Sequence, residues 1–163
     1  MSGARSWLRR HLLEPVLNQL RQGMSPEKIA LTIALGLSLS VFPILGSTTL
    51  LCLLAGIAFK LNQPLIQIAN YLGYPLQILL LLPFYRAGAW LGAPHLALSI
   101  PELVDRFKDS PWQFLLDFGL IALGGVGIWC LCAPLFIGLV YLLLVMPLRL
   151  LGRRVTAARS APV

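Results

Sequence analysis

Residues 63–85 read QPLIQIANYLGYPLQILLLLPFY, an apolar run interrupted at regular intervals by polar side chains. An α-helix rises about 1.5 Å per residue, so residues 64–85 span roughly the 30 Å hydrocarbon core of a bilayer. We therefore predict a transmembrane helix over residues 64–85, and the rest of the chain is best understood from this helix outward.

The polar side chains of this segment recur every three or four residues and so share one helix face. They form a polar stripe: Gln63, Gln67, Asn70, Tyr74 and Gln77. Amides cost free energy in hydrocarbon unless they meet partners or water, so this face should contact protein or a hydrated cavity. Two interpretations stay open: the stripe binds neighbouring helices together, or it lines a path for a polar solute or lipid headgroup.

Two shorter apolar runs precede the stripe and are joined by Pro43-Ile44-Leu45-Gly46. As helices they would each be about 20 Å long, which is short for a bilayer span. We predict a helical hairpin over residues 25–60 that enters and leaves on the cytoplasmic side, with two thin, tilted spans as the alternative. Its predicted tip consists of Pro43, Gly46, Thr48 and Thr49. The hydroxyls of the two threonines could meet backbone groups or a ligand.

Local signals support the hairpin and its junction with the striped helix. Ser25 before Pro26 and Asn62 before Pro64 are typical N-cap and first-turn pairs, so we expect helices to begin there. Small residues recur at every fourth position in both arms, which lets helix backbones approach closely. These rows are Thr32, Gly36 and Ser40 in the first arm and Thr48, Cys52 and Gly56 in the second.

Composition and charge indicate an integral membrane protein. Of the 163 residues, 58% are hydrophobic and only 12% are charged. The net charge of +7 comes from basic residues before the first apolar run and after the last one, not from a nucleic-acid-binding patch. Because excess Lys and Arg mark the cytoplasmic side, we predict a multi-pass protein with both termini cytoplasmic.

The predicted fold class is an all-α integral membrane protein. An amphipathic basic interfacial helix, 1–22, precedes a single helical membrane domain, 23–148, and a basic cytoplasmic tail, 149–163. The membrane domain is divided into the hairpin 25–60, the span 64–85, an external loop with an interfacial helix at 86–117, and a long closing span at 118–148. Ser110-Pro111 is expected to begin the helix that becomes this last span.

No catalytic, metal or cofactor site can be assembled from the sequence. His11 and His95 have no carboxylate or cysteine at a ligand or triad spacing. The cysteines, Cys52, Cys130 and Cys132, lie in apolar runs and are expected to be small buried residues. We therefore expect a protein that is not an enzyme and uses no cofactor.

A set of short motifs resembles one bacterial membrane family. In chain order they are Gly23-Met24-Ser25-Pro26, Ile29-Ala30, Gly36, Pro43-Ile44-x-Gly46, Asn62-x-Pro64, Tyr74-Pro75, Pro83-Phe84-Tyr85 and Gly92. Their order and spacing resemble the family called domain of unknown function 2062 (DUF2062). That resemblance implies a small protein of the bacterial inner membrane, in some members joined to a glycosyltransferase-like domain, and it supplies no function.

Two functional hypotheses follow from these features. The first is transport or flipping of a polar or amphiphilic substrate, such as a lipid-linked sugar or a lipid headgroup. Since one chain has few helices to enclose a path, it would act as a homo-oligomer in contact with membrane lipids. The alternative is a non-transporting adaptor or scaffold, whose basic ends recruit anionic lipid or a cytoplasmic partner and whose stripe binds a partner span in the membrane. Neither hypothesis involves nucleic acid.

Overall fold

The structure is a computed structural model that describes Glu14, residues 24–92, Asp105 and residues 108–160. Its elements are α3 (Pro26–Ser40), α4 (Thr48–Ala58), α5 (Gln63–Gly88), the short 3-10 helix η2 (Ala89–Leu91) and α7 (Pro111–Ser160). Within these residues the predicted all-helical fold is confirmed, and two segments are long and apolar enough to cross a membrane, Gln63–Leu91 and Phe118–Arg153. The predicted interfacial helices at 1–22 and within 86–117 lie largely outside the described residues.

The helices begin where the local signals predicted. The Ser25 side chain accepts a hydrogen bond from the Lys28 backbone N–H at 3.3 Å, and Pro26 occupies the first turn of α3. The Asn62 side chain accepts one from the Leu65 backbone N–H at 2.9 Å, at the start of α5. Each cap satisfies an N–H group that has no partner within its helix, which confirms both predicted N-caps.

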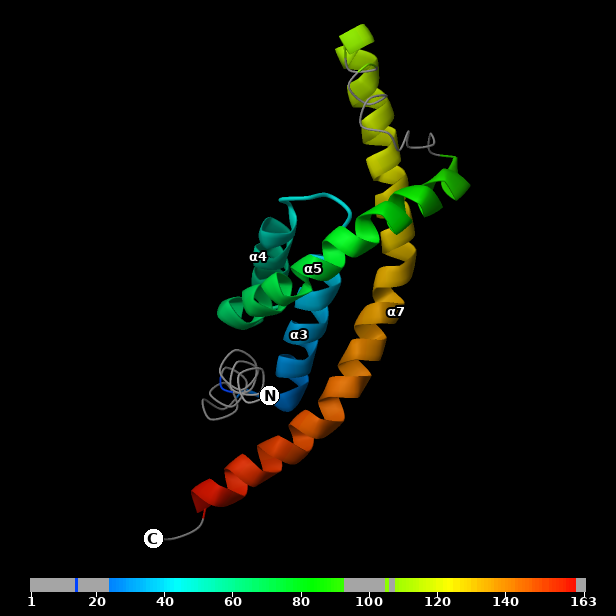
Figure 1. The fold of residues 1–163 in the computed structure, drawn as a ribbon. Helices are drawn as coiled ribbons and strands as arrows, with labels where there is room; N and C mark the ends of the chain where they lie inside the picture. The colour runs from blue at the N-terminus through cyan, green and yellow to red at the C-terminus, as the bar shows by residue number, and fades with distance from the viewer. Residues whose placement is uncertain (1–13, 15–23, 93–104, 106–107, 161–163) are drawn as a thin grey trace, which may run out of the picture.

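The hairpin of α3 and α4 packs against α5 and α7 (Figure 1). At one end of the bundle, a buried cluster joins the starts of α3 and α5 to the later part of α7: Ile29, Ala30, Leu65, Val145 and Leu148. At the other end, Gly88 of α5 lies against the backbone of Gly124 and Gly125 in α7. The start of α3, the start of α5 and the end of the apolar part of α7 therefore share one end of the bundle.

Small residues allow α3 and α5 to pack closely. A Cβ atom added at Gly36 would lie 2.6 Å from the Ala69 Cβ and 2.8 Å from the Ile66 carbonyl oxygen. The two predicted rows of small residues are buried throughout, namely Thr32, Gly36, Ser40, Thr48, Cys52 and Gly56. Backbone contact at this distance explains why those positions carry small side chains.

The long helix α7 continues to Ser160, through most of the predicted basic tail. Cys130 and Cys132 are exposed, so the prediction that all three cysteines are buried is correct only for Cys52. Hydropathy shows that a segment is apolar but does not show which face turns away from the other helices.

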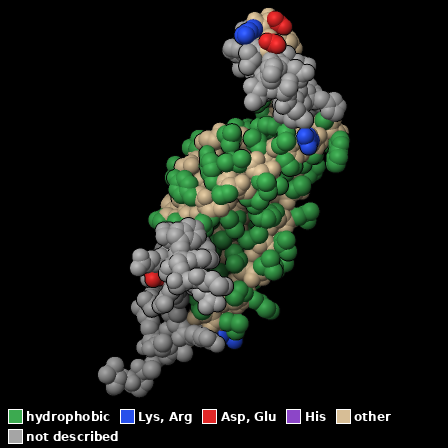
Figure 2. All heavy atoms as spheres, in the orientation of Figure 1, with side chains coloured by type: hydrophobic (Ala, Val, Ile, Leu, Met, Phe, Trp, Pro, Cys, Tyr) green, Lys and Arg blue, Asp and Glu red, His purple; other side chains and the backbone are tan. Residues whose placement is uncertain are grey.

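The outside of the bundle is itself apolar. Figure 2 shows hydrophobic side chains across the middle of the visible face, while the charged side chains drawn there lie toward its two ends. On α7, Leu135 is 78% exposed and Met146 is 73% exposed. The helix curves along its length and has Pro134 and Pro147 in its interior, where proline removes a backbone hydrogen bond and bends a helix (Figure 1).

We predict that Gly36→Ala destabilises the protein, because the new methyl group meets the α5 backbone. Overpacking of this kind typically costs about 1–3 kcal/mol. Gly138→Ala is the matched control, since a Cβ there has nothing within 4 Å, and alanine in a helix interior is favoured over glycine by about 0.5–1 kcal/mol. The free energy of unfolding in mild detergent measures both. Equal stability of the two variants would contradict the close α3–α5 contact.

We also predict an acid-sensitive ion pair between the start of α3 and the later part of α7. Arg149 Nε donates to Glu27 Oε1 at 2.7 Å. The pKa of the Glu27 carboxyl lies below its usual value of 4.5, first because its own backbone N–H donates to it and next because of Arg149. This stabilisation is present above the unfolded-state pKa and is lost as pH falls through the lowered pKa.

The melting temperature measured from about pH 6 to about pH 3 tests this contact. We expect it to fall further in the wild-type protein than in Glu27→Gln, which lacks the titrating group. Parallel curves for the two proteins would show that the pair contributes no pH-dependent stability.

Candidate functional site at the hairpin tip

The last turn of α3 and the hairpin turn, residues 41–47, leave backbone carbonyl groups without helical partners inside the bundle. Side chains from α5 and α7 donate to them: Gln77 Nε2 to the Phe42 oxygen at 2.7 Å, Tyr85 Oη to the Pro43 oxygen at 2.7 Å, and Trp129 Nε1 to the Ser38 oxygen at 3.1 Å. A buried backbone carbonyl outside a regular helix needs a hydrogen-bond donor from protein or water. These three side chains supply such donors.

The turn lies beside the apolar part of α7, not beyond its end. The Phe42 ring packs edge-on against Trp129, with ring centroids 5.0 Å apart. Trp129 lies within the apolar segment Phe118–Arg153. The 15 residues of α3 correspond to about 22 Å of helix, less than the roughly 30 Å of a hydrocarbon core.

The first half of the polar stripe binds α4 to α5. Gln63 Nε2 donates to the Leu53 carbonyl at 3.0 Å, and Gln67 Nε2 donates to the Thr49 carbonyl at 3.1 Å. Asn70 Nδ2 makes two longer contacts, at 3.5 Å with Thr49 Oγ1 and at 3.4 Å with Gln67 Oε1. The amide nitrogens of the stripe are therefore used within the chain, on α4 and on the turn.

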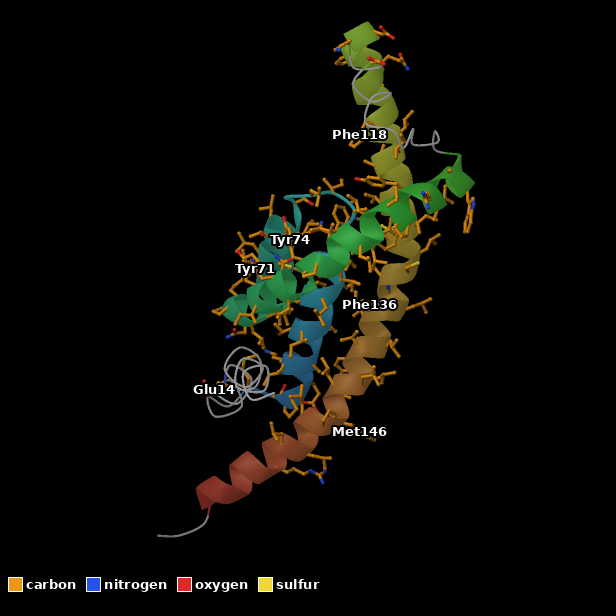
Figure 3. The ribbon with its side chains drawn as sticks, in the orientation of Figure 1. Glu14, Tyr71, Tyr74, Phe118, Phe136 and Met146 are labelled. Atoms are coloured by element: carbon orange, nitrogen blue, oxygen red, sulfur yellow. The ribbon has the colours of Figure 1, made fainter. Side chains whose placement is uncertain are left out.

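Tyr74 is the stripe residue that the structure does not bring to the hairpin through a described hydrogen bond. Its side chain is 36% exposed, and Tyr71 beside it is 60% exposed. Figure 3 places both tyrosines on the half of α5 that lies next to α4, away from α7. Among the predicted tip residues, Pro43 and Thr48 are buried, whereas Gly46 is exposed in the turn with φ of 83°, a left-handed conformation that favours glycine.

Tyr85 and Trp129 belong to this site and were missed by sequence reasoning. Tyr85 follows Gln77 by eight residues on the same helix and lies within about 80° of it, so the stripe could have been extended to it. Trp129 has no comparable signal. Its donor role depends on α7 packing beside α3, which only the tertiary structure shows.

Several side-chain oxygens at the tip are buried without a hydrogen-bond partner in the described residues. We call four of them the hairpin-tip oxygens: Ser38 Oγ, Thr48 Oγ1, Asn70 Oδ1 and Gln77 Oε1. Their residues are at most 1% exposed. Leaving such a group unpaired costs about 1–3 kcal/mol, so four of them around one hairpin call for an explanation.

The chemistry of the tip is polar and uncharged. Hydroxyl and amide groups do not titrate near neutral pH, so these groups are not suited to act as general acids or bases. The described residues contain no cluster of three or more His, Cys, Asp or Glu side chains that could hold a metal ion. The arrangement is suited to hydrogen bonding with a polar group.

We predict that Gln77→Leu destabilises the protein by about 1–3 kcal/mol, because it leaves the Phe42 carbonyl buried without a donor. Tyr74→Phe, on the exposed face of the same helix, should change stability by less than about 0.5 kcal/mol. Unfolding in mild detergent measures both variants. Equal stabilities would mean that the turn does not depend on the Gln77 amide.

Comparison with known proteins identifies a family but no characterised relative. A family model described as "Uncharacterized protein conserved in bacteria (DUF2062)" matches residues 7–155, nearly the whole chain. Neither the curated proteins nor the solved structures contain a match to the chain.

Proposed function

The chain belongs to the bacterial family DUF2062, and on that premise we propose that it transports or flips a polar or amphiphilic substrate across the inner membrane. The observation that carries the proposal is the set of hairpin-tip oxygens, which are buried and unpartnered among apolar helices. Polar positions at membrane depth that line substrate paths have this chemistry. Lipid-linked sugars and lipid headgroups are the substrate class we propose.

We propose that the hairpin is re-entrant. We also propose that one end of the bundle faces the cytoplasm, namely the end that holds the start of α3 and the basic end of α7. The length of α3 and the position of the turn beside Trp129 support a hairpin that does not cross the bilayer. Exposed basic side chains gather at the proposed cytoplasmic end: Lys28, Lys60, Arg149 and Arg153. Excess Lys and Arg mark that side, which places both termini in the cytoplasm.

Substrate entry requires the hairpin tip to separate from α5, because Asn70 and Gln77 are 0% exposed. The contacts to be broken are a few hydrogen bonds, each with a net contribution of about 0.5–1.5 kcal/mol. A polar substrate that replaces them offsets this cost. Such an opening needs a wall on the exposed side of α4 and α5, which a second copy of the chain would supply in a homo-oligomer.

A non-transporting adaptor is the second candidate, and the exposed basic residues at one end favour it. Each Lys or Arg near an anionic membrane surface contributes on the order of 1 kcal/mol, so several together could recruit an acidic partner to that surface. The nitrogens of the stripe do not support a partner span, because they bind α4 and the turn. Crosslinking in cells followed by co-purification tests this candidate, and recovery of self-contacts alone would contradict it.

We predict that purified protein in liposomes moves fluorescent lipids between leaflets, measured by bleaching with a reductant that cannot cross the membrane. The matched control locks the tip to α5. Thr49→Cys with Asn70→Cys, in a chain whose native cysteines are replaced, joins positions whose side chains lie 3.5 Å apart. The disulfide form should be inactive, whereas the reduced form should keep the activity of the Asn70→Cys single variant, which lacks the same amide but cannot form the lock. Protein-free rates for every lipid would contradict transport, and full activity of the locked form would exclude the tip as the path.

A further inference from the structure

We propose that the hairpin tip takes uncharged hydroxyl groups, as in a sugar or polyol headgroup, in preference to a phosphate or carboxylate. The inference rests on the proposed transport function and names its substrate class. Its basis is the direction of the hydrogen bonds at the tip, which decides what chemistry is left for a ligand.

The orientation of the Gln77 amide is decided by its partner. The Phe42 carbonyl can only accept, so the Gln77 nitrogen must face it and the Gln77 oxygen must face elsewhere. The same argument applies to Gln67, whose nitrogen faces the Thr49 carbonyl. Interchanging nitrogen and oxygen in either amide would set two acceptors against each other.

The orientation of Gln67 in turn decides that of Asn70. Because Gln67 Oε1 can only accept, Asn70 presents its nitrogen to it at 3.4 Å. Asn70 Oδ1 is then left without a donor, as is Gln77 Oε1. The amide nitrogens thus donate to the hairpin and to Gln67, and the oxygens of Asn70 and Gln77 remain as acceptors for a ligand, as do the hydroxyl oxygens of Ser38 and Thr48.

Each of these oxygens belongs to the turn region. Ser38 lies one helical turn before Phe42, whose carbonyl binds Gln77. Thr48 begins α4, and its neighbour Thr49 contacts Asn70. Two hairpin-tip oxygens, those of Ser38 and Thr48, therefore lie on residues just before and just after the turn in sequence. The other two belong to Asn70, which contacts Thr49, and Gln77, which donates to Phe42.

The start of α4 adds donors to this set of acceptors. Ser47 precedes the helix but provides no side-chain cap, because its hydroxyl donates to the Ile44 carbonyl at 2.8 Å. First-turn N–H groups of a helix have no partner within it, so an uncapped α4 presents them at the turn. Backbone donors therefore lie at the start of α4, whose first residue, Thr48, carries one of the buried acceptors.

A hydroxyl group matches both kinds of group, since it donates one hydrogen bond and accepts others. A phosphate or carboxylate oxygen only accepts, and it would face the Asn70 and Gln77 oxygens with no cationic side chain among the residues bonded to the tip. An ammonium only donates and would be a buried charge without a counter-ion. Water has the same chemistry as a single hydroxyl, so the experiment must separate water from a headgroup.

Two substitutions test the tip without removing any described hydrogen bond. Ser38→Ala and Thr48→Val each delete an oxygen that has no partner in the structure. The matched controls are Ser40→Ala and Thr32→Val, whose hydroxyls donate to carbonyls within α3 at 2.7 Å and 2.6 Å. We expect Ser38→Ala and Thr48→Val to keep or raise the melting temperature measured without added ligand, because each deletes a buried unpartnered group, and to lose the rise that a ligand causes.

The probes are fluorescent monoglycosyl diacylglycerol and phosphatidate, in liposomes that hold wild-type or variant protein. We expect the glycosyl lipid to cross severalfold faster than phosphatidate. Ser38→Ala and Thr48→Val should each lower its rate severalfold, and the control variants should leave it unchanged. The melting temperature in nanodiscs with each lipid gives a readout besides transport, and the glycosyl lipid should raise it in the wild type only.

The outcomes separate this inference from the proposed function. Phosphatidate moving as fast as the glycosyl lipid would overturn the hydroxyl preference and leave transport standing. Ser38→Ala and Thr48→Val could instead keep the wild-type crossing rate of the glycosyl lipid and the rise in melting temperature that it causes. The deleted hydroxyls would then bind water only, which also overturns the inference. If neither lipid moves but the glycosyl lipid still stabilises the wild type alone, transport fails while the preference for hydroxyl groups is retained. If neither lipid moves and the glycosyl lipid does not stabilise the wild type, both the transport proposal and the preference for hydroxyl groups are contradicted.

Discussion

A carbonyl group that leaves a helix inside apolar surroundings needs a hydrogen-bond donor, and the Phe42–Pro43 turn has two such groups. Gln77 and Tyr85 of α5 donate to them, and both contacts are 2.7 Å long. Without donors, each carbonyl would be buried at a cost comparable to a large share of a small domain's stability. The position of α5 across the hairpin, and the presence of amides in an otherwise apolar helix, follow from this requirement.

The same requirement links the fold to the proposed chemistry. Because the amide nitrogens must face backbone carbonyls, the amide oxygens of Asn70 and Gln77 cannot. They remain buried and unpartnered, as do the hydroxyl oxygens of Ser38 and Thr48. A hairpin held in this way has a polar interior at its tip while its outer surface, on α4 and α7, stays apolar. That combination is what a protein handling a polar group within a bilayer needs.

Much of this arrangement could be predicted from the sequence because it follows local rules. The period of the polar stripe, the N-caps at Ser25 and Asn62 and the spacing of small residues each depend on one helix at a time. The two interpretations of the stripe could not be separated, because the partner of an amide depends on which backbone packs against it. Here the amide nitrogens of Gln63, Gln67 and Gln77 bind the hairpin, as the first interpretation expects, and the second interpretation stays a prediction.

The misses have the same origin. Trp129 and Tyr85 become donors only when α7 and α5 lie beside the turn, and the exposure of Cys130 and Cys132 depends on which face of α7 has no neighbour. Basic residues begin at residue 149, and α7 continues through them to Ser160, because a change from apolar to basic residues does not by itself end a helix.

The contact between Gln77 and Phe42 is the most direct test of the account. Solid-state NMR of the protein in lipid bilayers can measure dipolar coupling between the ¹⁵N-labelled side-chain amide of Gln77 and the ¹³C-labelled carbonyl of Phe42. The account predicts a strong cross-peak, since the nitrogen lies 2.7 Å from the carbonyl oxygen. A Gln77 amide coupled to lipid or water, with no coupling to the Phe42 carbonyl, would contradict it.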